Sequence, residues 1–228
     1  MMVKPFKTDL IKPSEFSIEE ILAKTFSRDD IPENTIVAIT SKIISLCEGS
    51  IEYKSTITKD ELIKKEADMF LDKNSNFDVF LTIKYDLLIP SAGIDESNAN
   101  GDYYIKLPAN PQLSACKCLE FLKNYCNINN LAVIITDSSP QPLRWGVIGK
   151  CIACCGLNPI NNKINQQDLF GNALSKTTVN VADALAASAV LCMGESDEQT
   201  PLCLIYDAPF VQFNDGNPSH NNMNSLQI

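Results

Sequence analysis

Polar residues that can bind anions or cations occur in four short stretches, each of which follows an apolar segment or ends a predicted helix. The stretches are TSKIISLCEGS (40–50), SAGIDESNANG (91–101), TDSSPQPLRWG (136–146) and MGESDEQTP (193–201). Loops of this kind, held on a rigid scaffold, often carry binding and catalytic groups. A functional site is therefore expected where these stretches come together.

Three of these stretches contain a carboxylate that could bind a metal ion: Asp95, Asp137 and Glu195. Hard cations such as Mg²⁺ and Mn²⁺ take oxygen ligands, commonly one or two carboxylates together with water and substrate phosphates. Each of these residues could instead be an ordinary turn or cap residue, because Asp suits turns. The residues alone leave both interpretations open.

Two cations lie in the same stretches. Lys42 could bind phosphate as a point charge, or it could be a solvated charge at the start of a helix. Arg144 is one of only two arginines among the nineteen basic residues. A planar, bidentate donor in a loop that ends at a glycine favours a specific anionic or carbonyl partner. Trp145, the only tryptophan, could simply pack over that loop.

The nine cysteines do not have the spacing of a zinc finger. Cys151, Cys154 and Cys155 form C-x-x-C-C, Cys116 and Cys118 form C-x-C, and the only histidine is His220 in a polar segment. Structural zinc sites usually need paired ligands that this pattern lacks. The cysteines are interpreted as small, buried apolar residues, with a metal or redox site as the alternative.

Composition is that of a globular protein large enough to bury a substantial core. The chain has 228 residues, of which 45% are hydrophobic and 21% charged, and its net charge is −9. An acidic chain is a poor partner for nucleic acid or an anionic membrane, and a small anionic ligand would need a local cation or metal. No run of 18 apolar residues and no signal peptide is found, which predicts a cytosolic protein.

Periodicity predicts helices and strands in irregular alternation. Helices are expected at 17–26, 58–71, 111–126 and 177–194, and strands at 34–40, 131–137 and 201–207, with two strands or a hairpin at 77–94. This order indicates a mixed α/β (α+β) fold. The chain has neither a P-loop nor a G-x-G-x-x-G fingerprint, so it is predicted to be neither a P-loop nor a Rossmann protein. One domain, or two interlocked subdomains, is expected over 1–213, and a polar tail over 214–228.

The four stretches and two neighbouring motifs resemble the coenzyme F420-0:L-glutamate ligase family of γ-glutamyl ligases. ITSKIIS…EGS is similar to T-S-K-I-V-S-K-A-E-G, SAGIDESN to N-A-G-[IV]-D-x-S-N, and LPANPQLSA to L-P-x-D-P-x-x-S-A. VIITDSSPQPLRWG is similar to V-I-I-[ST]-D-T-x-x-R-P-x-R-x-G, and VNVADALAASAVLCMGE to A-V-A-D-E-L-A-A-A-A-x-L-x-M-G-E. The similarity extends, in family order, from about Ile11 to Phe213.

The resemblance implies a homodimeric ligase with a family-specific fold that uses GTP (or ATP) and Mg²⁺ or Mn²⁺. Lys42 and Arg144 are predicted to act in catalysis, and the resemblance implies that the metal is held by Asp95, Asp137 and Glu195, with Ser138 beside them. The nucleotide would be bound by Ile11, Lys12, Pro13, Ser14, Ser41, Lys42, Asn98, Glu195, Ser196, Asp197, Glu198 and Gln199. The partners would be L-glutamate and an acceptor, either F420-0 or a folate.

Ligation of this type suits the residues present. A carboxylate becomes an acyl donor once it is phosphorylated, and the amine of glutamate can then attack the acyl phosphate. Phosphoryl transfer depends mainly on positioning and on neutralising charge, so it needs no protein nucleophile. A chain without a Ser–His arrangement is compatible with this route.

The sequence departs from the family pattern at three positions that bear on function. The second lysine of the first motif is Leu46, which removes a phosphate contact, and the family Arg and Trp of the fourth motif are Gln141 and Leu143. The fourth and fifth motifs are closer to a bacterial branch associated with folate. Two other interpretations stay open: a non-catalytic binder of nucleotide or folate, and a thiol–metal protein.

Overall fold

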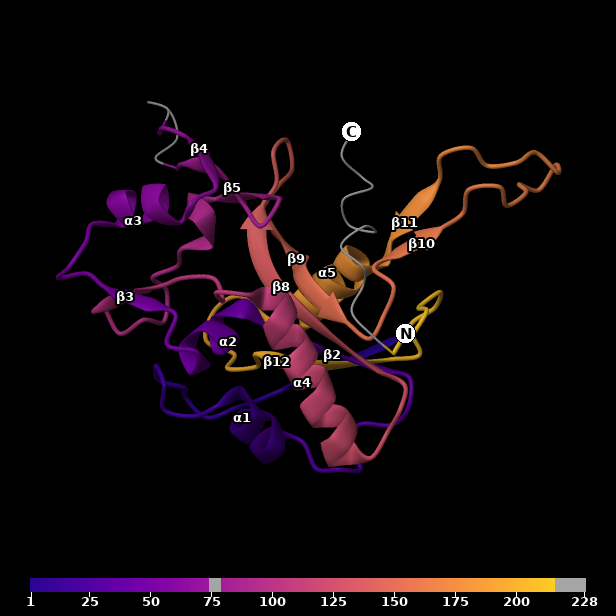
Figure 1. The fold of residues 1–228 in the computed structure, drawn as a ribbon, viewed down its shortest axis with the longest axis horizontal. Coiled ribbons are helices and arrows are strands. Elements are labelled where there is room, and N and C mark those ends of the chain that lie inside the picture. Colours follow the sequence, from indigo (N-terminus) through magenta and orange to yellow (C-terminus); the bar gives the residue numbers. More distant parts are fainter. Residues whose placement is uncertain (74–78, 216–228) are drawn as a thin grey trace.

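A five-stranded sheet forms the centre of the protein, with strand order β1-β12-β2-β8-β9 (Figure 1). The computed structural model describes residues 1–73 and 79–215. The sheet consists of β1 (Met2–Phe6), β12 (Leu202–Tyr206), β2 (Thr35–Thr40), β8 (Leu131–Pro140) and β9 (Val147–Cys155). Neighbouring strands run antiparallel except β2 and β8, which pair in parallel.

Helices cover both faces of this sheet, which explains why its inner strands contain continuous apolar runs such as 36–39 and 131–135. Val37 and Ile39 face α1 (Ile18–Thr25), α2 (Ser41–Cys47) and α4 (Pro111–Cys126), whereas Ile36 and Ala38 face α5 (Val181–Met193). Figure 1 shows α4 in front of the sheet and α5 behind it.

Local capping sets where the helices begin. At α1, the Ser17 hydroxyl accepts a hydrogen bond from the backbone of Glu20, whose side chain bonds back to Ser17. Thr58 and Glu61 form the same capping box at α3 (Lys59–Glu66). α4 begins with a proline after the cap Asn110. Such caps satisfy backbone N–H groups that have no partner within the helix.

Three small sheets and a short 3-10 helix flank the core. β3 (Ile51–Tyr53) pairs with β7 (Tyr103–Ile105). β5 (Leu81–Lys84) pairs with both β4 (Met69–Leu71) and β6 (Leu87–Pro90), after which the 3-10 helix Ser91–Gly93 follows. β10 (Ile160–Asn162) and β11 (Thr178–Asn180) form a hairpin whose long loop projects from the body of the protein (Figure 1).

The predicted mixed α/β class is confirmed, and two helix boundaries are wrong. The helix predicted over 58–71 ends at Glu66, because Met69–Leu71 pairs with β5 instead. The helix predicted over 177–194 begins at Val181, because Thr178–Asn180 is a strand. The predicted tail lies mostly outside the described residues. Within 1–73 and 79–215, no helix is both long and apolar enough to cross a membrane.

Candidate active site

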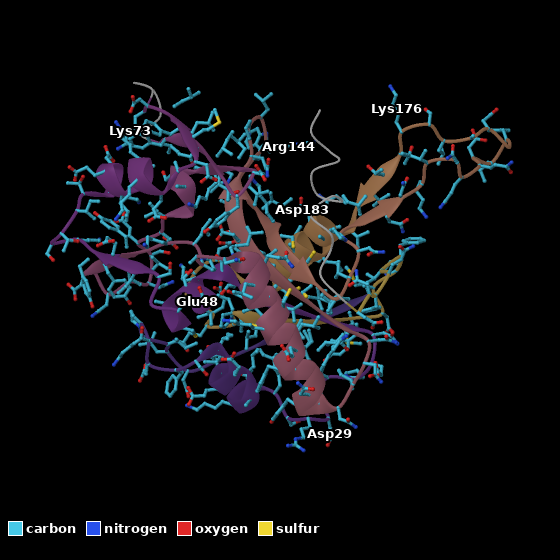
Figure 2. All side chains as sticks on the ribbon, in the orientation of Figure 1. Asp29, Glu48, Lys73, Arg144, Lys176 and Asp183 are labelled. Atoms are coloured by element: carbon cyan, nitrogen blue, oxygen red, sulfur yellow. The ribbon has the colours of Figure 1, made fainter. Side chains whose placement is uncertain are left out.

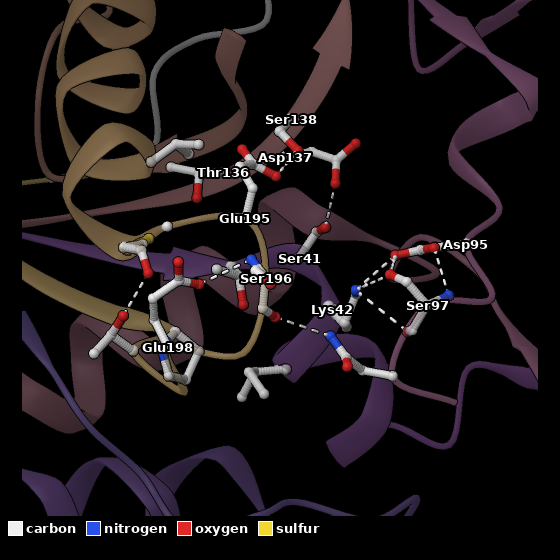
Figure 3. A pocket seen from close by; sticks show the side chains of 18 of the residues that line it. Ser41, Lys42, Asp95, Ser97, Thr136, Asp137, Ser138, Glu195, Ser196 and Glu198 are labelled. Carbon is white, nitrogen blue, oxygen red and sulfur yellow. Dashed lines mark hydrogen bonds and ion pairs between the residues drawn. The ribbon is translucent and has the colours of Figure 1, made fainter. Parts of the chain in front are cut away.

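The four polar stretches meet at a cavity of about 520 Å³ (Figure 3). Its lining includes Ser41 and Lys42 from the first stretch, Asp95, Ser97 and Asn98 from the second, Asp137 and Ser138 from the third, and 194–201 from the fourth. Ligand pockets in proteins commonly have this size. The sequence-based expectation that these stretches come together is confirmed.

The parallel pairing of β2 and β8 creates the centre of the site. Thr40 and Thr136 form the last residue pair of the parallel β2–β8 register, so the next residues, Ser41 and Asp137, lie side by side. The Ser41 hydroxyl donates a hydrogen bond of 2.9 Å to Asp137 Oδ1. Carboxyl ends of adjacent parallel strands are a common location for ligand sites in α/β proteins.

Lys42 is held beside this centre by the second stretch. Its Nζ lies 2.6 Å from Asp95 Oδ2 and donates to Ser97 Oγ at 2.9 Å. Ser97 in turn donates to Asp95 Oδ2 at 2.8 Å. Figure 3 shows the three side chains as one connected group. Lys42 is therefore an oriented cation at the cavity wall rather than a freely solvated charge.

The fourth stretch closes the opposite side of the cavity. α5 ends at Met193, and the next residue, Gly194, has a φ of 81° that suits glycine and redirects the chain into the loop. Ser138 Oγ donates to Glu195 Oε2 at 2.9 Å, and Asn98 Nδ2 donates to the carbonyl of Ser196 at 3.4 Å. The loop is thus tied both to β8 and to the second stretch.

Asp137 and Asp95, both in the cavity wall, have opposite pKa shifts. Burial raises the pKa of Asp137 to about 6, and the negative charges of Asp95 and Glu195 act in the same direction, against the Ser41 hydrogen bond and the charge of Lys42. Burial also acts to raise the pKa of Asp95, but hydrogen bonds from Lys42 and Ser97 and the charge of Lys42 hold it below its usual value. Strongly perturbed acids in a cleft are typical of functional sites.

The carboxylate and hydroxyl oxygens of the cavity suit a hard cation, although each carboxylate contacts a side chain of the protein. Asp95 faces Lys42, Asp137 faces Ser41, and Glu195 faces Ser138. Among the described residues, no three acidic, His or Cys side chains converge closely enough to hold a metal ion. A Mg²⁺ or Mn²⁺ site here would therefore use one or two of these carboxylates and complete its shell with substrate oxygens.

A buried hydroxyl beside this donor set gives a further reason to expect a polar ligand. Ser139 lines the cavity, and its Oγ is buried with no hydrogen-bond partner in the part of the chain that the structure describes. Buried polar atoms are normally satisfied, so a water or ligand contact is expected there.

Several residues of the predicted nucleotide and catalytic sets lie outside the cavity lining. Ile11 lines the cavity, but Lys12, Pro13 and Ser14 do not; the backbone N–H of Ser14 donates to the carbonyl of Leu46 at 2.8 Å instead. Their nucleotide role stays a prediction.

Arg144 also lies away from the cavity. It is exposed at the tip of the β8–β9 hairpin (Figure 2), and the neighbouring Leu143 and Trp145 are fully exposed. Trp145 does not pack over the loop as the sequence suggested. Arg144 therefore does not line the cavity of its own chain, and its catalytic role stays a prediction.

Sequence reasoning missed two features of the cavity wall. Ser97, which bonds both Lys42 and Asp95, was not singled out, although it lies two residues after Asp95. The segment Thr8–Leu10 also lines the cavity. It follows the edge strand β1, which was not predicted.

The sequence is similar to a known protein family and to several of its members. The model of a family described as F420-0:Gamma-glutamyl ligase matches residues 5–207. The Coenzyme F420:L-glutamate ligase of Methanothermobacter thermautotrophicus is 33% identical over 199 residues, which cover 80% of this chain and 78% of that protein. The Coenzyme F420:L-glutamate ligase of Methanococcus maripaludis is 34% identical over 213 residues, covering 86% of this chain and 84% of that protein.

Proposed function

Because this chain belongs to the F420-0:Gamma-glutamyl ligase family, we propose that it is a nucleotide- and metal-dependent ligase. It joins the amine of L-glutamate to the carboxylate of F420-0, forming an amide bond. GTP, or ATP, supplies the phosphoryl group that activates the acceptor carboxylate and leaves as the nucleoside diphosphate. The names of the similar archaeal proteins support the choice of glutamate and of F420-0.

The observation that carries this proposal is the convergence of the four stretches on one cavity. Ser41 and Asp137 are hydrogen-bonded, and Lys42 and Asp95 are paired, across long separations in the chain. Phosphoryl transfer proceeds by positioning the phosphate and neutralising its charge. One lysine and several carboxylates that can hold a metal ion, all around one cavity, are suited to this task.

Each group has a role in this chemistry. Lys42 binds a phosphate as a point charge, once the incoming anion displaces Asp95 from its Nζ. Asp137, with Asp95 or Glu195, holds the metal ion, and Ser41 orients the Asp137 carboxylate. The metal, when bound, neutralises charge on the nucleotide phosphates. The acceptor carboxylate attacks the γ-phosphate and releases the nucleoside diphosphate. The glutamate amine then attacks the carbonyl carbon of the acyl phosphate, loses a proton and releases inorganic phosphate.

The test is the dependence of phosphate release on every component. With nucleotide and Mg²⁺ or Mn²⁺, phosphate release should require both F420-0 and glutamate for full rate. Hydroxylamine, used in place of glutamate, should trap the activated acceptor as a hydroxamate. Nucleotide binding without any component-dependent phosphate release would instead favour the non-catalytic binder.

A reduced folate is the second candidate acceptor. The loop between β8 and β9 departs from the family pattern at Gln141 and Leu143, and the fourth and fifth motifs are closer to the folate-associated branch. Both acceptors present a carboxylate to be glutamylated, so the same reaction applies. Parallel assays with F420-0 and tetrahydrofolate separate them.

We also propose that the ligase is a homodimer. Large apolar side chains are exposed at the tip of the β8–β9 hairpin, including Leu143 and Trp145, and on the β10–β11 arm, where Leu169 is 100% and Phe170 89% exposed. Apolar patches of this kind commonly mark protein–protein contacts. Light scattering coupled to size-exclusion chromatography should give twice the chain mass, and a monomer at working concentration would contradict the dimer.

A further inference from the structure

The clustered cysteines of β9 are divided between the two faces of the central sheet. A β-bulge between Ile135 and Thr136 changes the register opposite Ile152. As a result, Cys154 packs on the α5 face, with Cys151 against the same cluster, whereas Cys155 packs on the α4 face. This division explains why the C-x-x-C-C sequence does not form a three-cysteine metal site in the described chain.

On the α4 face, Cys155 meets a cysteine from a different element. The Sγ atoms of Cys116, on α4, and Cys155 are 2.7 Å apart. Gln112, one helical turn before Cys116, fixes this approach, since its Nε2 donates to the carbonyl of Cys154 at 2.8 Å. A disulfide bond has an S–S length of about 2.05 Å, so only a small adjustment of side chains is needed to form one.

We propose that Cys116 and Cys155 are a redox-responsive pair that closes a disulfide between α4 and β9. Cys116 is half-buried and can be reached by a small disulfide, whereas Cys155 is buried beneath it. Burial, together with the contact to Cys116, raises the pKa of Cys155 to about 12. Cys155 is therefore a poor first nucleophile and reacts second, with the sulfur already beside it.

The oxidant is a low-molecular-weight disulfide such as glutathione disulfide. The Cys116 thiol loses its proton and its sulfur attacks the oxidant, which releases one glutathione thiol and leaves a mixed disulfide. Cys155 then loses its proton and attacks the Cys116 sulfur, releasing the second glutathione thiol. Two protein thiols are oxidised to one disulfide, and one external disulfide is reduced to two thiols.

The product would fasten α4 to the sheet across a separation of 39 positions in the chain. A cross-link of that span restricts the unfolded chain, so the oxidised protein should melt at a temperature on the order of 5–10 °C higher. This proposal does not depend on the ligase activity, because it concerns residues away from the cavity.

Peptide mapping tests the link directly. The full chain is equilibrated with glutathione disulfide, its remaining thiols are blocked with N-ethylmaleimide, and it is digested with trypsin. Cleavage after Lys106, Lys117, Lys150 and Lys163 gives peptide 107–117, which contains Cys116 alone among the cysteines, and peptide 151–163, which contains Cys151, Cys154 and Cys155. The expected product is these two peptides joined, with fragment ions that locate the bond at Cys155.

Matched variants keep the test independent of folding defects. Cys116→Ser, at a half-buried position, should lose both the link and the oxidant-dependent rise in melting temperature. Cys154→Ser should keep the link, and Cys192→Ser, at an exposed position, should keep both. Glutathione remaining on Cys116 as a mixed disulfide, a bond to Cys151 or Cys154, or no reaction at Cys116 would each overturn the proposal.

Discussion

Ser41 and Asp137, 96 positions apart in the chain, are joined by a hydrogen bond of 2.9 Å. The bond exists because β2 and β8 run parallel in register up to the pair Thr40–Thr136, so the residues that follow this pair lie together. It places Asp137 next to Lys42 and so brings the metal-binding and phosphate-binding groups of the proposed ligase into one cavity.

Replacing Asp137 with Asn should abolish ligation and make the metal-free protein more stable at pH 7. The pKa of Asp137 is about 6 in the folded protein, against about 3.9 when unfolded. Between these values the folded state binds a proton that the unfolded state has released, so the free energy of unfolding falls as the pH rises from about 4 to about 6. Above pH 6 the free energy of unfolding stays lower by this amount, because the buried Asp137 is ionised. Asn carries no charge, so Asp137→Asn should raise the free energy of unfolding at pH 7 by roughly 1–3 kcal/mol.

Urea unfolding of both proteins at pH 7 and pH 4 checks this sign. The gain from Asp137→Asn should be present at pH 7 and largely absent at pH 4. Asp29→Asn, at an exposed position away from the cavity, serves as a control for charge removal alone. An Asp137→Asn protein that is less stable than the parent at pH 7 would contradict the buried, ionised carboxylate.

Metal affinity should fall as the pH is lowered through 6. A proton on Asp137 competes with the cation, so affinity for Mn²⁺ should weaken by up to about tenfold per pH unit below the pKa of about 6. Calorimetric titration with Mn²⁺ at pH 5, 6 and 7.5 measures this change. Affinity that stays constant over this range would remove Asp137 from the metal site.

Lys42→Ala should raise the KM for the nucleotide by about tenfold or more, with a smaller effect on the KM for glutamate. A charge-assisted contact to phosphate contributes roughly 1.5–3 kcal/mol. Lys59 also forms an ion pair with a carboxylate, Glu96, and has similar exposure, but it does not line the cavity. Lys59→Ala is therefore the control and should leave both constants unchanged. Equal, small effects of Lys42→Ala on the two substrates would show that Lys42 does not bind phosphate.

Arg144→Lys should weaken acceptor binding about tenfold. We further expect Arg144 to act on the site of the other chain in the proposed dimer. Because Arg144 does not line the cavity of its own chain, we expect its guanidinium to reach the acceptor site of the partner in the proposed dimer. Mixing Arg144→Lys with Lys42→Ala chains then creates sites with both groups intact, and activity should exceed that of either variant alone. No recovery in mixed dimers, shown to form by mass spectrometry, would exclude this role.

The long, strongly patterned elements could be predicted from the sequence, and the short ones could not. The helix over 111–126 matches its prediction because Pro111 starts it and a regular apolar face runs its length. β3, β7, β10 and β11 have three residues each, too few for a period to be recognised. β9 was missed because its bulge interrupts the alternation and its cysteines were not recognised as alternating between two faces.

The site residues could be found because their stretches follow buried strands or end helices, but their mutual contacts could not. That Lys42 pairs with Asp95, and not with Asp137, depends on the turn that follows the 3-10 helix Ser91–Gly93. That Arg144 is remote depends on the length of β8, which continues to Pro140 beyond the predicted end at Asp137. Such details arise from tertiary pairing, which a single sequence does not specify.

The most direct measurement is mass spectrometry of the product formed from F420-0 and from tetrahydrofolate, each with glutamate, GTP or ATP, and Mg²⁺ or Mn²⁺. The expected product is one of these acceptors increased by the mass of one or more glutamyl residues, formed by the parent protein and not by Asp137→Asn. Unchanged acceptors in every combination, from a folded protein that binds nucleotide, would contradict the ligase.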